Sequence, residues 1–215
     1  MKPFFAIALL VVAGQHALAA DAGDYFLDTY LSYGYSGVAS ESMQEIVRLA
    51  PGLRIEFSPR TQVVLEGRVR LDFADELEPR KVDTSTYSSL SRPAVVNDLG
   101  TADIRDAYME RTLDNGILRL GKQQIVWGKL DGIKVLDVLN PQDLREFILD
   151  DFSESRISLW SAYLDVTVAG WRTEIALIPD NTGHAIPAQG AWFELTAPRY
   201  RYGANPEDPV LPVVT

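Results

Sequence analysis

Apolar and polar residues alternate along much of this chain. The clearest alternation covers residues 45–73, where two long runs flank a turn at Ser58-Pro59-Arg60-Thr61. In both runs one parity is mostly apolar and the other is mostly charged. Because successive side chains of a strand point to opposite sides of a sheet, the pattern predicts two strands with one apolar and one polar face. Each is as long as, or slightly longer than, the roughly 9–11 residues that cross a bilayer at a tilt.

Alternation predicts five further strands, at residues 24–35, 103–112, 117–126, 157–168 and 171–178. Two of them are irregular. In 103–112 the parity is unclear, because Asp106 and Glu110 share a face with Ile104 and Tyr108. In 117–126 the apolar parity is interrupted near the end by Lys122 and Gln124. About seven strands are therefore expected.

Short and long connections alternate between these strands. The short ones are the Ser-Pro-Arg-Thr turn, Asp114-Asn115-Gly116 with its favoured Asn-Gly dipeptide, and Ala169-Gly170. The long ones are residues 36–44, 74–102, 127–156 and everything after Pro179. In an up-and-down antiparallel sheet this order puts the tight turns at one end and the long loops at the other. Outer-membrane barrels have this asymmetry, with short periplasmic turns and long extracellular loops.

A soluble β-sandwich would also show alternation. Its strands, however, are commonly about 5–6 residues long, and structureless loops above about 12–15 residues are uncommon in compact domains. Trp127 and Trp160 flank the outer ends of their strands, and Trp171 starts a strand at the turn side, which suits two aromatic belts. We therefore expect an all-β fold, a partial antiparallel up-and-down transmembrane β-barrel. A soluble or surface-exposed β-sheet binding module and a structural barrel with a plugged lumen are the alternatives.

The first 19 residues have the composition of a signal peptide. Lys2 supplies a positive charge, residues 4–13 are apolar, and Ala17-Leu18-Ala19 fits a cleavage site. The expected organisation is a signal peptide over 1–19 and the N-terminal part of an outer-membrane barrel over 20–215. The expected location is the outer membrane, where lipid and lipopolysaccharide would surround the protein.

Composition argues against several classes of function. Loss of Lys2 leaves 19 Lys and Arg against 30 Asp and Glu, a formal charge of −11, which argues against nucleic acid as a partner. Cysteine is absent, and His184 is the one histidine after the signal peptide, so a histidine-based metal cluster is excluded. No Gly-x-Ser-x-Gly, phosphate loop or dinucleotide fingerprint occurs. We expect no enzymatic activity, no cofactor and no metal.

Charged residues on the polar parity are the candidates for lining a pore, because an aqueous interior makes charge tolerable on membrane-spanning strands. They are Arg54, Glu56, Glu66, Arg68, Arg70, Asp72, Arg119 and Gln123. Their mixed signs allow two roles, selection of a solute or a ladder of opposite charges that holds the sheet together.

The long loop after residue 126 carries the other candidates, which are Trp127, Gly128, Asp131, Asp137, Asn140, Pro141 and Asp143. Asn140 as a cap and Pro141 at the first helical position predict a short helix near 141–149. This helix could constrict the barrel mouth or simply pack outside it. Trp127-Gly128 could line a solute path or anchor a strand end. Asp150, Asp151 and Glu154 lack the spacing of a calcium loop and favour a solvated acidic loop.

Part of this region resembles a known family. The segment LGKQQIVWG at residues 120–128, followed by Asp131, Asp137, Asn140-Pro141 and Asp143, resembles the signature of an uncharacterised Gram-negative outer-membrane barrel family, catalogued as domain of unknown function thirteen-oh-two. The resemblance extends to Ser158-Leu159-Trp160 and Ile178-Pro179, and covers most of residues 45–190. It implies a porin-like barrel of several hundred residues with no established catalytic activity.

The chain departs from that family in its length. Bacterial single-chain barrels have an even number of strands, and the terminal PEDPVLPVVT is too proline-rich to continue the strand pattern. We therefore expect an N-terminal fragment of a larger barrel. The expected function is that of a porin-like channel for passive passage or export of a small solute. The sequence identifies neither the solute nor the oligomeric state.

Overall fold

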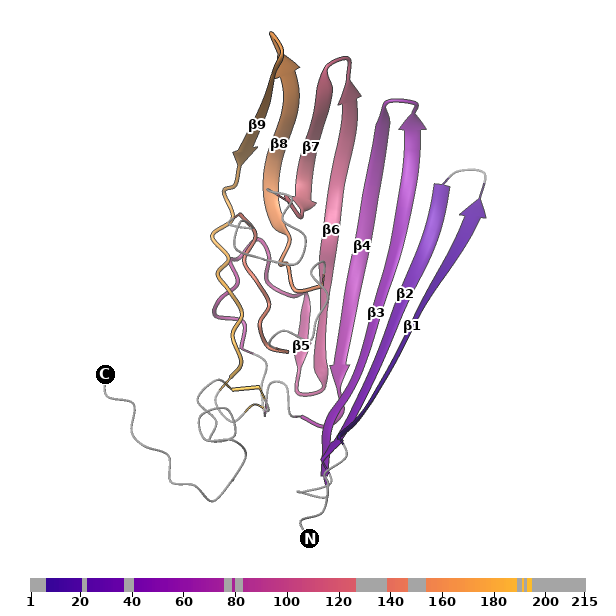
Figure 1. Cartoon of the computed structure of the whole chain (residues 1–215), viewed down its shortest axis with the longest axis vertical. Helices are drawn as coiled ribbons and strands as arrows, with labels where there is room; N and C mark the ends of the chain where they lie inside the picture. Colours follow the sequence, from indigo (N-terminus) through magenta and orange to yellow (C-terminus); the bar gives the residue numbers. More distant parts are fainter. Residues whose placement is uncertain are drawn as a thin grey trace, which may run out of the picture.

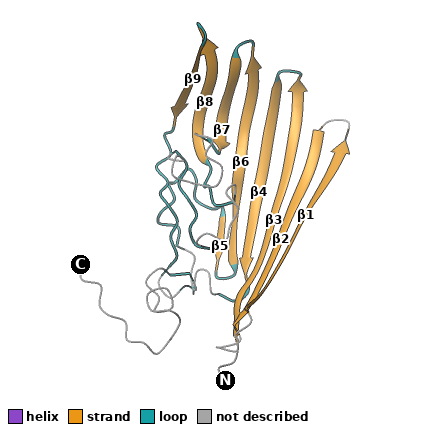
Figure 2. Cartoon of the chain, in the orientation of Figure 1, coloured by secondary structure: helices purple, strands orange, loops and turns teal. Residues whose placement is uncertain are grey.

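The structure is a computed structural model that describes residues 7–20, 23–36, 41–75, 79, 83–126, 139–146, 154–188, 191, 193 and 194. The strands within these residues form one open antiparallel sheet, and no described residue is helical (Figures 1 and 2). Its strands are β1 (Ile7–Ala20), β2 (Gly23–Ser36), β3 (Glu41–Ser58), β4 (Thr61–Asp72), β5 (Val95–Asn97), β6 (Gly100–Leu113), β7 (Gly116–Gln123), β8 (Leu159–Val168) and β9 (Trp171–Leu177). No helix of this described part is long and apolar enough to cross a membrane.

The strands follow one another across the sheet in the order β1-β2-β3-β4-β6-β7-β8-β9, with the short β5 paired to β6. This confirms the predicted all-β, up-and-down antiparallel topology. The tight turns between β3 and β4, β6 and β7, and β8 and β9 lie at the upper end of the sheet in Figure 1. We call this the turn end and the opposite end, where the longer connections leave the sheet, the loop end.

The seven predicted strands correspond to β2, β3, β4, β6, β7, β8 and β9. Two strands were not predicted. The first, β1, lies within the predicted signal peptide except for Ala20 and pairs with β2 from Ile7↔Ser36 to Ala20↔Gly23. Cleavage of residues 1–19 stays a prediction. The second, β5, has three residues, too few for a visible alternation.

The long joint predicted at residues 36–44 is wrong. β3 begins at Glu41, so only residues 37–40 lie between it and β2. The residues at 41–44 are mostly polar and show no apolar alternation, but an antiparallel ladder is made by backbone groups and accepts them. The alternation of short and long joints therefore holds from β3 onward.

The sheet from β3 to β9 has one apolar and one charged face, as predicted. Arg48 lies opposite Arg70, Arg68 opposite Asp103, and Glu110 opposite Arg119, which places these side chains on one face. The other face, here the apolar face, leaves large hydrophobic side chains exposed, among them Leu65, Ile104, Leu120, Val168, Trp171, Ile175 and Leu177. Several charged side chains of the sheet, such as Arg68 and Arg70, are thus buried while these apolar side chains are exposed, the reverse of an ordinary soluble domain.

A β-bulge explains the unclear parity of 103–112. Glu66 pairs with Asp106 and Gly67 pairs with Ile104, so Arg105 is the extra residue of β6. The bulge shifts the parity by one residue. Asp103 and Asp106 consequently share the charged face, and Ile104 lies on the apolar face with 52% of its surface exposed.

Loop segments cover the loop end of the charged face (Figure 2). The central one comprises residues 139–146, hereafter the strap. The strap lies between residues 154–158 and 180–186, to which it is joined by the bridges Gln142↔Arg156 and Asp143↔Ala185. Small buried apolar clusters, Ile46 with Phe193 and Tyr87 with Ile157 and Ala185, lie in the covered region.

The predicted helix near 141–149 is wrong for its described residues, 141–146, which have no helical backbone. Their backbone groups bond to neighbouring segments instead of to each other. Asp143 N donates to Ser155 O at 2.6 Å, Leu144 N donates to Ala185 O at 2.7 Å, and the Pro141 carbonyl accepts from Ile157 N at 2.9 Å. Residues 147–149 lie outside the described part.

Candidate functional site: the charged face and its strap

The eight predicted pore-lining residues share the charged face, but their surroundings differ. Arg54 and Glu56 are exposed near the turn end, and Arg119 is about one-third exposed. Glu66, Arg68, Arg70, Asp72 and Gln123 lie toward the loop end and are buried or half-buried. We call these two regions the open half and the covered half of the charged face.

The open half carries ion pairs between strands. Arg119 Nε lies 2.5 Å from Glu110 Oε2 and its guanidinium stacks 5.6 Å from the Tyr108 ring centroid. Farther along, Arg172 of β9 contacts Asp165 at 2.8 Å and Glu174 at 3.0 Å. These pairs link β6 to β7 and β8 to β9 through opposite charges.

The covered half contains ion pairs within the sheet itself. Arg68 Nη2 contacts Asp103 Oδ2 at 2.8 Å, and both side chains are buried. Arg105, at the bulge, contacts Glu66 at 2.9 Å. Each guanidinium is thus neutralised by a carboxylate on a neighbouring strand.

The position of Lys122 explains why the apolar parity is interrupted near the end of the predicted strand at 117–126. Its register partners are Ala107 and Trp160, yet the side chain is buried and its Nζ donates to the Ile104 carbonyl at 2.7 Å. The preceding Gly121 has φ of +133°, and a Cβ there would lie 2.2 Å from Ala107 O. Glycine therefore permits both the close strand approach and the irregular backbone that precedes Lys122.

Strap carboxylates contact arginines of the covered half. Glu146 Oε1 lies 2.6 Å from Arg48 Nη2 and 3.6 Å from Arg70 Nη2. Asp143 Oδ2 lies 3.2 Å from Arg70 Nη1 and 2.5 Å from Arg145 Nη2. Burial opposes the ionisation of Asp143, but the charges of Arg145 and Arg70 hold its pKa well below the usual range. Asp143 is therefore a carboxylate at neutral pH.

Glu154 also belongs to this network. It contacts Arg105 at 2.5 Å and Arg48 at 3.7 Å. The interpretation of 150–154 as a solvated acidic loop is therefore wrong for Glu154, whose carboxylate is held by arginines of the sheet. Asp150 and Asp151 lie outside the described residues.

The strap is positioned by Asn140. Its Oδ1 accepts from Ile125 N at 2.9 Å, and its Nδ2 donates to Ile157 O at 2.9 Å. Asn140 thus joins the segments after β7 and before β8 and does not cap a helix. Gln142 N donates to His184 Nδ1 at 2.9 Å, which gives the single histidine of this region a structural contact.

Asp180 joins a second pair of covering segments. It accepts hydrogen bonds from the hydroxyl groups of Ser88, at 2.5 Å, Ser91, and Thr182, at 2.7 Å. Burial opposes ionisation of this carboxyl too, but the hydroxyl donors lower its pKa to about 2. The ionised Asp180 side chain thus helps to join residues 83–91 to residues 178–186, together with the Gly183 N to Thr86 O hydrogen bond of 2.7 Å.

Of the predicted loop motif, the structure brings together Asn140, Pro141 and Asp143 in the strap. Trp127, Gly128, Asp131 and Asp137 lie outside the described residues. The prediction missed Arg48, Arg105, Arg145 and Glu146 as members of the charged cluster. Parity could have identified Arg48, which shares a face with Arg54, whereas no sequence pattern marks the long-range contacts of Glu146.

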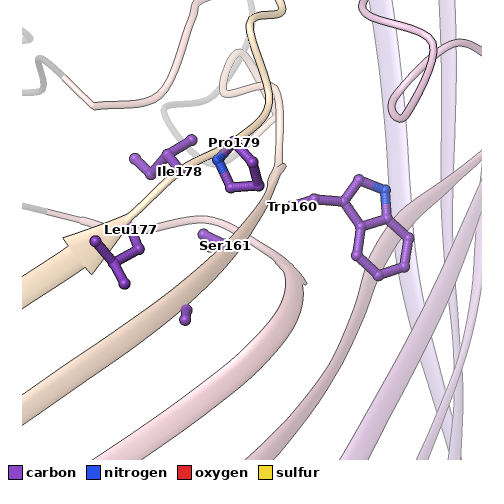
Figure 3. A pocket seen from close by; sticks show the side chains of 6 residues that line it. Trp160, Ser161, Leu177, Ile178 and Pro179 are labelled. Atoms are coloured by element: carbon purple, nitrogen blue, oxygen red, sulfur yellow. The ribbon is translucent and has the colours of Figure 1, made fainter.

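An apolar hollow of about 610 Å³ opens where β9 ends beside β8. It is lined by Trp160, Ser161, Ala162, Leu177, Ile178 and Pro179 (Figure 3). The Trp160 indole Nε1 donates to Leu90 O at 2.8 Å, which fixes the ring at the loop end. The hollow has no convergent charged groups, and within the described ranges no group of three or more potential metal ligands occurs.

Comparisons with family models, curated proteins and solved structures gave no match. The resemblance to the outer-membrane family therefore stays a prediction based on residues 120–143 and the flanking segments.

Proposed function

We propose that the sheet forms part of the wall of a porin-like outer-membrane channel. The charged face would line an aqueous lumen through which a small solute diffuses or is exported, and the apolar face would contact lipid. The observation that carries this proposal is the inverted distribution of side chains, with exposed Leu65, Ile104 and Leu120 on one face and sheltered Arg68, Arg70 and Arg105 on the other. A lipid surround makes such an apolar surface favourable over several adjacent strands.

Strand length and aromatic placement support the same function. β3, β4, β6 and β8 have 18, 12, 14 and 10 residues, which suffices for tilted strands that cross a bilayer. Trp171 is 79% exposed at the turn end, and Trp160 lies at the loop end. Aromatic side chains at both ends suit the two membrane interfaces.

Export and cleavage are also part of the proposal. Removal of residues 1–19 would take away nearly all of β1 and leave β2 as an edge strand. An exposed edge has unpaired backbone groups and pairs readily with another strand. In a closed barrel that position would be filled by a further strand.

The covered half favours a variant of this function, a barrel whose lumen is plugged or narrowed. Glu146 and Asp143 are each only 1% exposed, so the strap fits closely against the sheet. In a closed barrel, a strap in this position would narrow the lumen.

Heat-modifiability in purified outer membranes tests the proposal. Without boiling, the protein is expected to migrate faster on a denaturing gel, because a closed barrel resists detergent. The band is expected only in the membrane fraction. Conductance in planar bilayers then separates an open channel from a plugged barrel. A soluble periplasmic product without a mobility shift would contradict the membrane channel and favour a soluble binding module.

A further inference from the structure

Two arginines face each other across neighbouring strands of the covered half. Arg48 of β3 and Arg70 of β4 are direct register partners, and each side chain is 4% exposed. Like charges directly opposite each other destabilise a sheet, and burial increases the repulsion. A sheet that keeps this pair requires negative charge beside it.

One carboxylate oxygen lies beside both arginines. Glu146 Oε1 is 2.6 Å from Arg48 Nη2 and 3.6 Å from Arg70 Nη2, and Asp143 Oδ2 is 3.2 Å from Arg70 Nη1. Guanidinium groups are planar and present several donors, which suits them to carboxylates. The arginine pair therefore holds a carboxylate that belongs to a loop segment and not to the sheet.

Arg68 and Arg105 differ from this pair, because each has a carboxylate partner that belongs to the sheet. Arg68 contacts Asp103 and Arg105 contacts Glu66, so these pairs stay together wherever the strap is. The contacts of Arg48 with Glu146 and of Arg70 with Asp143 depend on the strap, and Arg48 has a longer contact of 3.7 Å with Glu154 outside it. Withdrawal of the strap would remove the carboxylates of Glu146 and Asp143 from these two guanidinium groups.

We infer that Arg48 and Arg70 form a binding site for the carboxylate group of an anionic solute, and that Glu146 occupies this site as an internal ligand. A solute carboxylate takes the place of the Glu146 carboxylate between the two guanidinium groups. This inference rests on the proposed channel, since the solute reaches the site through the lumen. It assigns organic acids as the solute class and gives the strap the role of a competitor.

Replacement of Glu146 by alanine tests the site directly. In the full chain in detergent micelles, Glu146→Ala leaves space between the arginines, and propionate is the probe, with uncharged propionamide as its match at equal ionic strength. Propionate is expected to raise the thermal midpoint of Glu146→Ala by about 3 °C or more over propionamide. Glu56→Ala, at an exposed position on the open half, is expected to show no such difference.

Two further variants complete the test. Glu146→Gln keeps the side-chain shape while it removes the charge, and is measured in parallel in case the alanine variant does not fold. Adding Arg48→Gln to either variant is expected to abolish the advantage of propionate. Equal midpoints in propionate and propionamide in every folded Glu146 variant, or an equal advantage in Glu56→Ala, would overturn the carboxylate site.

Bilayer recordings separate this inference from the proposed channel. In Glu146→Gln the permeability ratio of propionate to potassium is expected to rise about twofold or more over the unchanged chain. An unchanged ratio in a conducting protein overturns the inference and leaves the channel intact. Absence of conductance in all variants, together with propionate-specific stabilisation in micelles, overturns the channel and leaves the carboxylate site intact.

Discussion

The open and covered halves of the charged face have similar side chains in different surroundings. In the open half Arg172 is 61% exposed beside Asp165, whereas in the covered half Arg68 is 7% exposed beside Asp103. Water screens the first pair and is excluded from the second. The comparison shows that one polar strand pattern can produce a solvated ladder or a buried ionic cluster, depending on what covers it.

The largest expected effect is in the covered half. Asp103→Asn leaves the buried Arg68 without its carboxylate partner, and removal of one member of a buried pair costs about 3–5 kcal/mol of unfolding free energy. Denaturant unfolding in detergent micelles measures the loss. A change no larger than that of an exposed pair would show that water reaches the covered half.

The second-largest loss of stability is expected from a charge placed on the apolar face of the sheet. Leu65→Arg places a charge on the apolar face and is expected to destabilise the proposed barrel by about 2–4 kcal/mol if the position lies near the bilayer midplane. Glu56→Arg, on the exposed part of the charged face, is the control and is expected to be better tolerated. Glu66 is unsuitable as a control, because it pairs with Arg105. Equal tolerance in folding assays in lipid bilayers would contradict the assignment of the faces.

A graded effect is expected from Asp180 in acid. Its pKa in the folded protein, about 2, lies below the ordinary 3.8, so the ionised carboxyl stabilises the fold. That contribution is complete above about pH 4 and is lost as the pH falls toward 2. Thermal midpoints of the parent and Asp180→Asn are therefore expected to converge over this range. A difference between the two thermal midpoints that stays constant with pH would show that ionisation of Asp180 does not stabilise the fold.

The smallest effect is expected in the open half. Asp165→Asn removes the same charge as Asp103→Asn, but its partner Arg172 is largely exposed, so the unfolding midpoint is expected to change little or not at all. High salt is expected to mimic the substitution in this half more than in the covered half. A loss as large as that of Asp103→Asn would remove the distinction between the halves.

The sheet was largely predictable because alternation is a local signal. Arg68 and Arg70 share a face through their spacing alone, and short turns such as Asp114-Asn115-Gly116 are encoded in neighbouring residues. The bulge at Arg105 was not predictable from a regular period of two, because one extra residue reverses the parity after it.

The strap was not predictable because its structure depends on distant partners. Arg48 and Glu146 are 98 positions apart. Asn140 and Pro141 have the local features of a helix start, but Asn140 bonds to Ile125 and Ile157, and the backbone of the following residues bonds to covering segments. Tertiary hydrogen bonds therefore overrode the local preference.

The most direct test of the central claim is to label adjacent residues on the two faces. The chain has no cysteine, so Arg119→Cys and Leu120→Cys each introduce a single thiol on β7. In intact outer membranes, a charged water-soluble maleimide is expected to label Arg119→Cys, which would face the proposed lumen, and to leave Leu120→Cys unmodified until the protein is denatured. Equal labelling of both thiols in native membranes would contradict a charged face in water and an apolar face in lipid.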